Sequence, residues 1–439
     1  MSTDVAFTPS KRAFMSAARK SAPDIGRSIA LGMYRDARRP RSASAPASVP
    51  RTTFDPTLPD KIANPYPDLE RIREHPVVVN EALNVWMIGR YDDVHTAVRE
   101  NLVMSSKDGI GLQAVVTTVV ATADPPEHTR LRRIAAPLLS KRSVQIQISD
   151  IHDLTRAALA PMKAGGTVDM VQALTIPVPI AVIARVLGVP PSEQAKFKEV
   201  SDVVTSGLFT AGGVAEGLRK LPRTLQSFLW LRSFLDSEIR RRANVPADDL
   251  INRFQLALDA GDLADYEAFI YTTTLLVAGN DTTTNLMGMM LVKLAEDYEL
   301  FRQLQADRSL IPGAVEEMLR WGAPVQWVTR VATAPYEIGG TVIPVGGKVM
   351  LFNASANRDP AKFADPDRFD IRRNTSGHLG FGYGLHFCLG AHLARLETIT
   401  ALNCLLDEVD GLELAGPVRW GTTPSLQGPA SVPVRIRRS

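Results

Sequence analysis

The chain has 439 residues, of which 45% are hydrophobic and 22% are charged, and its formal net charge is +3. This balance is ordinary for a globular protein and makes no case for nucleic-acid binding. Cys388 and Cys404 are the only cysteines, so the fold needs no disulfide framework, and a reducing, cytoplasmic setting is expected. No uninterrupted apolar segment of about 18 residues occurs, so no transmembrane helix is predicted.

Residues 1–59 differ in composition from the rest of the chain. Basic side chains outnumber acidic ones there, and residues 41–50 are rich in serine, alanine and proline, as linkers are. We predict a basic, largely disordered arm over residues 1–59 and one folded domain over residues 60–439. A partner-binding arm, a membrane-surface arm and a transit peptide are the open alternatives for this N-terminal part.

The folded domain is predicted to be mainly α-helical with small β-sheets. Strand-like runs cover residues 77–79 and 85–88, and a helix begins at Tyr91. A loop follows over residues 104–118. Residues 140–260 then show helical patterns separated by glycine and proline pairs.

The second half of the chain contains the longest predicted element. A helix over residues 262–296 would be roughly 50 Å long at 1.5 Å per residue, enough to cross the whole domain. Residues 336–344 are predicted to form a hairpin around Gly339-Gly340. Strands near residues 418–420 and 432–435 complete the prediction.

The segment Phe381-Gly-Tyr-Gly-Leu-His-Phe-Cys-Leu-Gly390 carries the most legible chemistry. Cys388 directly precedes a helix-forming run, so unpaired amides of the helix start can stabilise its thiolate, which is a strong ligand for iron. Gly382 and Gly384 suit backbone with positive φ next to a flat cofactor. A structural cysteine in a glycine turn, and a zinc site formed by His386, Cys388 and His392, are the alternatives.

The middle of the long predicted helix breaks the rules for a buried helix. Residues 275–284 combine Gly279 with the acidic and hydroxyl side chains of Asp281 and Thr282 inside an apolar segment. Polar groups at such a position mark a candidate functional site. The alternative is a polar core cluster, in which these side chains only hydrogen-bond within the protein interior.

His128 and Arg132 are four residues apart, so they share one face of a predicted helix. Two cationic donors on one face suit a carboxylate group of a cofactor. A solvated basic face is the alternative.

The pattern F-G-x-G-x-H-x-C-x-G resembles the haem-thiolate loop of the cytochrome P450 family, and every fixed position is filled. Residues 278–282 resemble the family's oxygen-activating motif, residues 124–133 its C-helix, and residues 317–320 its E-x-x-R motif. These motifs occur in the family's order, and the resemblance covers about residues 62–436. It implies a P450 fold with the long central helix over a haem b.

The resemblance assigns roles to individual residues. Cys388 would be the axial ligand of the haem iron, Asp281 would relay protons and Thr282 would hydrogen-bond oxygen. The remaining haem-binding candidates comprise propionate donors, residues facing the ring and residues of the cysteine loop: His128, Arg132, Arg330, His386, Ala278, Gly279, Phe381 and Gly390. In the same way, Glu317, Arg320 and Arg368 would form a buried frame that holds the loop leading to Cys388.

Substrate contacts are the least determined part of the prediction. The positions that the resemblance places near substrate are Ile110, Leu112, Val115, Leu275, Val325, Gln326, Val328 and Leu426. The resemblance also implies that residues 140–260 form the roof over the substrate, with Val203, Leu208 and Phe209 as candidate contacts. Gln326 is polar, so it would orient a substrate oxygen or be satisfied by a backbone or water partner. Small aromatic acids, fatty acids and terpenoids all remain open as substrates.

The resemblance implies a monooxygenase that inserts one oxygen atom of O2 into a small lipophilic substrate. The chain has neither a flavin nor a nicotinamide fingerprint, so a ferredoxin with its reductase would supply electrons. Arg130, Arg133, His392 and Arg395 would make the docking face over Cys388 basic. A haem sensor, a haem electron carrier, and a peroxide-driven or coupling P450 are the alternatives.

Overall fold

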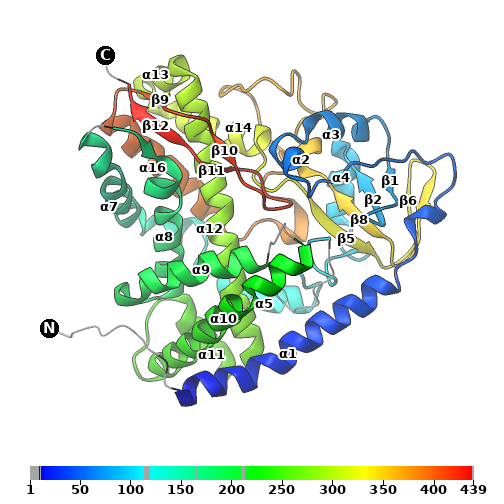
Figure 1. Cartoon of the computed structure of the whole chain (residues 1–439), viewed down its shortest axis with the longest axis horizontal. Coiled ribbons are helices and arrows are strands. Elements are labelled where there is room, and N and C mark those ends of the chain that lie inside the picture. Colours follow the sequence, from blue (N-terminus) through cyan, green and yellow to red (C-terminus); the bar gives the residue numbers. More distant parts are fainter. Residues whose placement is uncertain (1–8, 10, 113–118, 165, 209–212, 438–439) are drawn as a thin grey trace.

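The computed structural model describes residues 9, 11–112, 119–164, 166–208 and 213–437. Most helices gather on one side of the molecule, and the largest sheet lies on the other (Figure 1). The prediction of a mainly α-helical fold with small sheets is confirmed. None of the helices in the described ranges combines the length and apolarity needed to span a bilayer.

The N-terminal arm differs from the prediction. Residues Lys11–Ala37 form helix α1, which packs against the long helix α10 (Gly213–Asn244). The prediction of disorder was wrong for these residues, because α1 is ordered by packing on a helix that lies far away in the chain. Ala17 and Ser21 are among the side chains buried on α1.

The largest sheet has five strands in the order β1-β2-β8-β5-β3. Its strands are β1 (Val78–Asn80), β2 (Val85–Ile88), β3 (Met104–Ser105), β5 (Val328–Ala332) and β8 (Lys348–Leu351). Strands β2 and β8 run parallel, and the other neighbouring pairs are antiparallel. The sheet places Thr329 and Arg330 of β5 in its buried interior.

Three smaller sheets complete the β structure. They are the hairpin β6 (Tyr336–Ile338) and β7 (Thr341–Ile343), the pair β10 (Arg419–Trp420) and β11 (Pro429–Ser431), and the sheet of β4 (Val168–Asp169), β12 (Pro433–Ile436) and β9 (Leu412–Leu414). The predicted hairpin is confirmed, and Gly339 and Gly340 at its turn have φ values of 53° and 74°. Both lie in the left-handed region that glycine adopts without strain.

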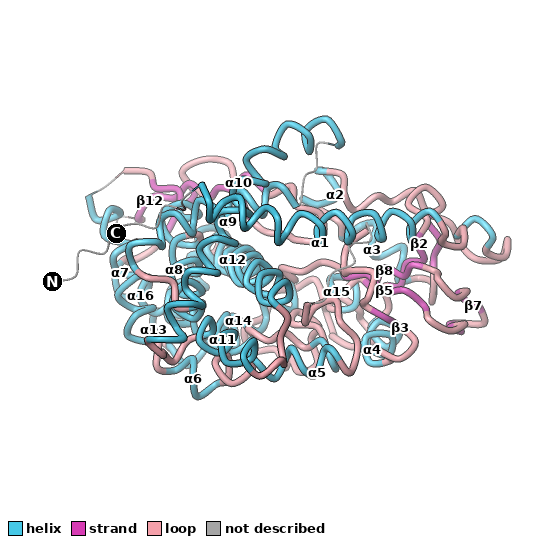
Figure 2. The backbone as a smooth tube through the Cα atoms, turned by 90° about the horizontal axis from the view of Figure 1, so that it is seen from below, coloured by secondary structure: helices cyan, strands magenta, loops and turns pink. Residues whose placement is uncertain are grey.

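The remaining helices form the layers around the core (Figure 2). In the first half of the chain they are α2 (Pro59–Ala63), α3 (Tyr66–Arg73), α4 (Tyr91–Arg99), α5 (Glu127–Ala135), α6 (Lys141–Gln145), α7 (Ile148–Leu159), α8 (Pro177–Leu187), α9 (Gln194–Leu208) and α11 (Leu250–Asp259). In the second half they are α12 (Asp265–Glu296), α13 (Tyr298–Ala306), α14 (Ile311–Trp321), α15 (Asn353–Ala356) and α16 (Ala391–Glu408).

Helix α12 is the axis of the helical layer. Its 32 residues correspond to about 48 Å at 1.5 Å per residue, and it contacts α8, α14 and α16. Large side chains on several of its sides are buried, among them Phe269, Leu276, Met287 and Leu294. A helix buried nearly all round can hold polar groups at fixed positions in the interior, and this one does so at its middle.

Candidate active site

The cysteine loop has the backbone that its glycines predict. Gly382 and Gly384 have φ values of 67° and 69°, and the Cys388 N–H donates to the Phe381 carbonyl oxygen at 2.9 Å. Helix α16 begins at Ala391, so Cys388 lies just before a helix start. A Cβ at Gly390, the residue before this helix, would meet no atom within 4 Å. The loop is therefore turned back on itself, and there is open space beside Gly390.

Two opposing effects act on the thiol of Cys388. Burial raises its pKa, whereas a hydrogen bond from the Gly390 amide and the charges of Arg132 and Arg395 lower it. The groups that favour the thiolate are thus supplied by the loop and by two flanking helices. The zinc alternative finds no support, since three or more potential metal ligands nowhere come together among the described residues.

The polar residues in the middle of α12 divide between two sides of the helix. Thr282 Oγ1 donates to the Ala278 carbonyl oxygen at 2.7 Å, and Ala278 is exposed although the helix around it is buried. Two residues further along, Thr284 Oγ1 donates to the Thr175 carbonyl oxygen at 2.7 Å. A separation of two residues is roughly 200° around a helix, so the two threonines face opposite ways.

Asn280 is buried and belongs to the second side. Its Oδ1 lies 3.4 Å from Thr284 Oγ1, while its Nδ2 donates to Asp281 Oδ1 at 3.1 Å. The alternative of a polar core cluster therefore describes Asn280 and Thr284. Ala278 and Thr282 remain on an open face, with Asp281 next to them in the chain.

Gly279 corrects one expectation. It was predicted to face the haem, but a Cβ at this position would lie 3.1 Å from Ile183 Cγ1 of α8. The glycine therefore allows close packing of α12 on α8. Gly279 follows Ala278 directly, so the two residues point about 100° apart around the helix, and only Ala278 turns to the open face.

Positive and neutral donors gather where the family places the haem propionates. His128 is only 1% exposed, and neither of its ring nitrogens has a hydrogen-bond partner within the described part of the chain. Its ring lies 4.8 Å from that of His386, centroid to centroid, and Arg132 Nη1 donates to the Leu385 carbonyl oxygen at 3.4 Å. Helix α5 and the cysteine loop thus meet through these side chains.

Arg330 adds a buried charge to the same region. It is 5% exposed, and its Nη1 donates to the Thr329 carbonyl oxygen at 2.8 Å. Burial lowers the pKa of Arg330 to about 10, and burial, with help from Arg330 and His128, lowers the pKa of His386 to about 3. Buried cations are costly without an anion, so this donor set fits the two carboxylates of a haem.

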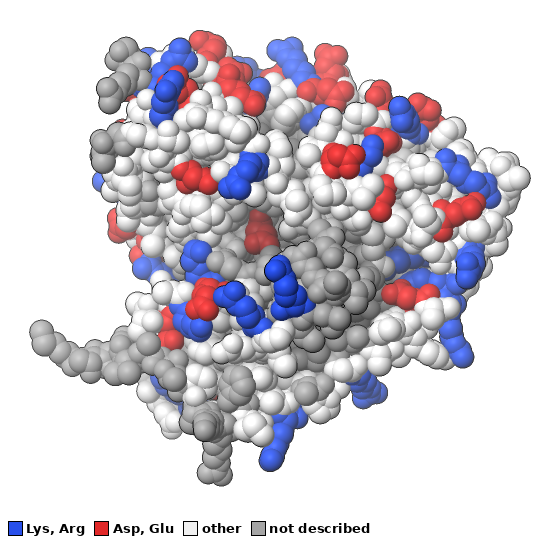
Figure 3. Space-filling model, viewed as in Figure 1, with Lys and Arg blue, Asp and Glu red and all other residues white. Residues whose placement is uncertain are grey.

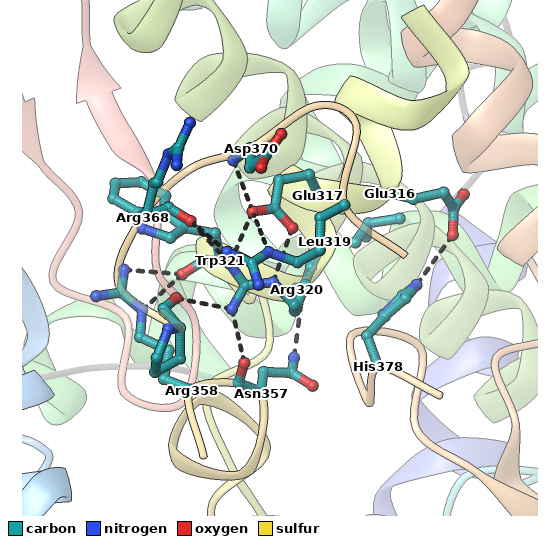
Figure 4. Close-up of polar contacts among 12 residues, drawn as sticks. Glu316, Glu317, Leu319, Arg320, Trp321, Asn357, Arg358, Arg368, Asp370 and His378 are labelled. Atoms are coloured by element: carbon teal, nitrogen blue, oxygen red, sulfur yellow. Dashed lines mark hydrogen bonds and ion pairs between the residues drawn. The ribbon is translucent and has the colours of Figure 1, made fainter. Parts of the chain in front are cut away.

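A buried ion pair anchors the loops that lead to Cys388 (Figure 4). Glu317 and Arg320 are fully buried on α14 and joined by two hydrogen bonds of 2.7 Å. Arg320 also donates to the carbonyl oxygens of Asn357 and Pro366, each at 2.8 Å. Asn357 Oδ1 accepts from the Leu379 N–H at 2.6 Å, which links the pair to the start of the cysteine loop.

The third member of this frame is Arg373, and the prediction of Arg368 was wrong. Arg373 Nε lies 3.2 Å from Glu317 Oε1. Arg368 has an exposed side chain and contributes only its carbonyl oxygen, which accepts from Arg320 at 3.3 Å and from Arg373 at 3.2 Å. The turn after Asp370, whose N–H also donates to Glu317, returns the chain toward α14 and brings Arg373 into range.

Glu316 is an anchor that the sequence analysis missed. It accepts from Arg395 at 2.5 and 2.9 Å and lies 2.9 Å from His378 Nε2. Despite its burial, the hydrogen bonds from Arg395 and His378 lower the pKa of Glu316 to about 2. Arg395 also lies over the Phe381 ring at 4.5 Å. In the sequence, the only sign of this role was that Glu316 directly precedes Glu317 of the E-x-x-R motif.

The substrate candidates differ in burial, and some of them lie outside the described residues. Val325 pairs with Leu426 in an isolated bridge, and Val328, Leu275 and Leu112 are half-buried apolar side chains. Ile110 is exposed, and its carbonyl oxygen accepts from the Thr329 N–H at 3.0 Å. Val115 and Phe209 lie outside the described residues, and so does the side chain of Leu208, whereas Val203 is half-buried on α9.

Gln326 has a backbone partner, which was one of its predicted alternatives. Its Nε2 donates to the carbonyl oxygens of Gly322 and Ala323 and, at 2.7 Å, to Gln427 Oε1. It is buried and lines a shallow groove with Phe54 and Leu426. Its amide nitrogen is therefore fully used within the protein.

Comparison with known proteins agrees with this geometry. Residues 232–410 match the family model described as Cytochrome P450. The chain is 33% identical over 377 residues to Cytochrome P450 109 of Bacillus spizizenii, which covers 85% of this chain and 92% of that protein. The chain belongs to the cytochrome P450 family. The protein is therefore a P450 monooxygenase, with a haem whose iron takes a cysteine thiolate.

Two further relatives of this P450 carry informative names. The beta-dihydromenaquinone-9 omega-hydroxylase of Mycobacterium tuberculosis is 32% identical over 382 residues, which is 86% of this chain and 77% of that protein. The crystal structure of CYP109E1 from Bacillus megaterium in complex with testosterone is 29% identical with a TM-score of 0.77, covering 87% of this chain and all of that one (100%).

The assignment of Arg373, and not Arg368, as the partner of Glu317 can be tested with a matched pair of arginine variants. Arg373→Ala should lower the free energy of unfolding by about 1–3 kcal/mol, because it removes a nearly buried charge from Glu317. Arg368→Ala should stay within about 0.5 kcal/mol, because its exposed side chain is not used. Urea midpoints and haem content after gel filtration measure both, and equal effects of the two variants would contradict the assignment.

Proposed function

We propose that this P450 inserts one oxygen atom of O2 into a neutral, lipophilic small molecule and receives its electrons from a ferredoxin. The observation that carries the proposal is the open face of α12, where Ala278 and the Thr282 hydroxyl stand in an otherwise buried helix. When bound, the haem supplies the iron at which O2 is activated. The chain's own residues hold the haem, shape the site and move protons.

The haem-binding roles follow from the positions and charges of the side chains around Cys388. Cys388 is the proposed axial ligand, because its amide and that of Gly390 orient the sulfur before α16. His128 and His386, together with Arg132 and Arg330, are proposed to hold the propionates. A pair of carboxylates would give His128 the hydrogen-bond partners that the protein does not supply.

Thr282 and Asp281 are proposed to deliver protons. Thr282 Oγ1 donates its hydrogen to the Ala278 carbonyl oxygen, so its lone pairs remain available to accept a hydrogen bond from a protonated group in the site. The Asp281 carboxylate is held on one side by the Asn280 amide at 3.1 Å. The pair can therefore fix the direction from which a proton arrives.

A neutral, lipophilic substrate is favoured over a carboxylic acid. The hydroxyls of Ser105 and Ser106 could have bound a carboxylate, but Ser105 donates to Asp124 at 2.6 Å and Ser106 lies 3.2 Å from His386 Nε2. The other candidate contacts, such as Val325, Val328 and Leu426, are apolar. The names of two relatives point to testosterone binding and to hydroxylation of beta-dihydromenaquinone-9, and both compounds are lipophilic.

A spin-state assay tests the substrate class. Testosterone and a menaquinone should be titrated against the ferric protein, with a fatty acid and a small aromatic acid as the charged comparisons. We expect the two neutral compounds to shift the haem absorbance at micromolar concentration and the two acids to shift it weakly or not at all. The reverse order would overturn the proposed substrate class, and turnover with reductant and O2 identifies the product.

The proton-delivery role of Thr282 can be tested against another threonine of α12. Thr282→Ala should lower product formed per pair of electrons by about tenfold or more, because the proton is no longer guided, and hydrogen peroxide should appear instead. Thr274→Ala is the control, since Thr274 makes the same bond to the carbonyl of residue 270, at 2.8 Å, two turns away. Full coupling in Thr282→Ala would remove this residue from proton delivery.

The ferredoxin-docking face is narrower than the sequence predicted. Arg130 is held by Glu267 at 2.5 and 3.0 Å, and Arg395 is held by Glu316. Arg133 is exposed, with Asp262 3.9 Å away, and His392 is exposed as well. The electrostatic contribution to docking is therefore proposed to centre on Arg133.

Charge reversal at Arg133 tests this docking face. Arg133→Glu should slow reduction by an acidic ferredoxin at low salt and approach the wild-type rate near about 1 M salt, where the Debye length is about 3 Å. Arg71→Glu on α3 is a matched control, since Arg71 is equally exposed and α3 lies away from α5 in Figure 1. Equal rates for wild type and Arg133→Glu at low salt would exclude Arg133 from docking.

A further inference from the structure

Helix α1 bridges two parts of the molecule that lie far apart in the chain. It lies along α10 and continues toward the loop between β3 and α5 (Figures 1 and 2). That loop carries the substrate candidates Ile110 and Leu112. It also carries Ser106, which contacts His386. Basic groups follow the lower right edge of the molecule, where α1 runs (Figure 3).

The N-terminal half of α1 packs on α10, and polar contacts tie the two helices together. Lys20 Nζ lies 3.2 Å from Asp236 Oδ2 and 4.0 Å from Asp265 Oδ2 at the start of α12. Ser233 Oγ donates to the Ala13 carbonyl oxygen at 3.5 Å. These contacts place α1 on the helix that belongs to the predicted roof of the site.

The C-terminal end of α1 binds the loop through Asp108. Arg35 Nη1 lies 2.5 Å from Asp108 Oδ1, and Arg39 Nη2 lies 2.9 Å from Asp108 Oδ2. Arg39 also pairs with Asp36 at 2.7 Å, so two arginines and two aspartates balance their charges. The side chains of Arg39 and Asp108 are only 6% and 12% exposed, so this contact is a built, desolvated junction.

Asp108 is joined through a short stretch of chain to the edge of the haem site. Two residues before it, Ser106 Oγ lies 3.2 Å from His386 Nε2, and the Ser106 N–H donates to Asp124 at 3.2 Å. Just after it, Thr329 Oγ1 donates to the Gly111 carbonyl oxygen at 2.8 Å, and Lys348 donates to that of Leu112. Moving Asp108 would therefore move the loop that lines one side of the site.

The ion pairs of Lys20 and Arg35 can open without unfolding the domain. Ala17, Ser21 and Ser28 are buried on α1, whereas the Lys20 and Arg35 side chains are 43% and 38% exposed. Salt screens such exposed ion pairs. Contacts of this kind belong to the low-stability end of a structure.

We propose that α1 is a strap that ties the roof helix α10 to the loop at residues 106–112 and thereby controls entry of ligands to the haem site. Arg35 and Arg39 are the positioning residues, and Asp108 is the point on which they act. The closed form is the one described here. The strap would act on any ligand that enters this site, so it does not depend on which substrate or electron donor the protein uses.

Ligand-entry rates test the strap. The probe is 4-phenylimidazole, a nitrogen donor that binds haem iron and changes its absorbance, mixed with the ferric holoprotein by stopped flow. The variant Arg35→Gln/Arg39→Gln should raise the association rate by about threefold to tenfold, because it removes one partly exposed and one nearly buried ion pair to Asp108. The matched control is Arg38→Gln, since Arg38 is exposed on the same end and lies over the Tyr34 ring at 4.4 Å.

A double-mutant cycle tells a strap from a general loss of stability. Asp108→Asn should raise the entry rate about as much as the arginine variant does, and combining all three changes should add little. Hydrogen exchange gives a readout that needs no ligand. Peptides covering residues 11–37 and 106–112 should exchange faster together in the arginine variant, while peptides of α14 and α16 should not change.

Two results would overturn the strap. One is an entry rate and an exchange pattern in Arg35→Gln/Arg39→Gln that match those of Arg38→Gln. The other is faster exchange over residues 11–37 with no change over residues 106–112 or in ligand entry, which would make α1 a surface helix without influence on the site. If the variant fails to fold, salt replaces it: wild-type exchange over both segments should rise together between about 0.1 and 1 M salt, as screening strengthens.

Discussion

The geometry around Cys388 depends on one buried ion pair, Glu317 with Arg320. Both side chains are fully removed from water, so each charge is stabilised by the other, by Arg373 beside Glu317 and by the backbone groups that point at them. Those groups come from the chain near residues 357, 366, 368 and 370. Any loop that moved would leave a buried charge without a partner, which is why the path to the cysteine is held so firmly.

Helix α12 places the Thr282 hydroxyl inside the protein core. Asn280 and Thr284 bond to the protein on one side, and this fixes the rotation of the helix about its axis. Thr282 can then be left facing the open side without loss of order. Gly279 adds to this precision, because it lets α12 approach Ile183 of α8 closely.

The polar and charged side chains at the two ends of the loop between β3 and α5 differ in whether the chain supplies their partners. At the α1 end, Arg35 and Arg39 are balanced by Asp36 and Asp108 within the chain. At the haem end, His128 keeps ring nitrogens without a partner among the described residues, and Arg330 is buried. The first arrangement is complete by itself, whereas the second needs an anionic cofactor to be complete.

The sequence by itself determined what short-range geometry controls. Positive φ at Gly382 and Gly384, the turn of the hairpin at Gly339, the pairing of Glu317 with Arg320 one turn away, and the shared face of Ala278 and Thr282 all follow from residue type and spacing. The family and its haem followed from the order of those motifs. Only the tertiary structure decided long-range partners, because these depend on the path of loops through space. It chose Arg373 over Arg368, turned Gly279 toward α8 and paired the Gln326 amide nitrogen with carbonyl groups of the preceding turn. It also placed α1 along α10, a contact between segments that are far apart in the chain.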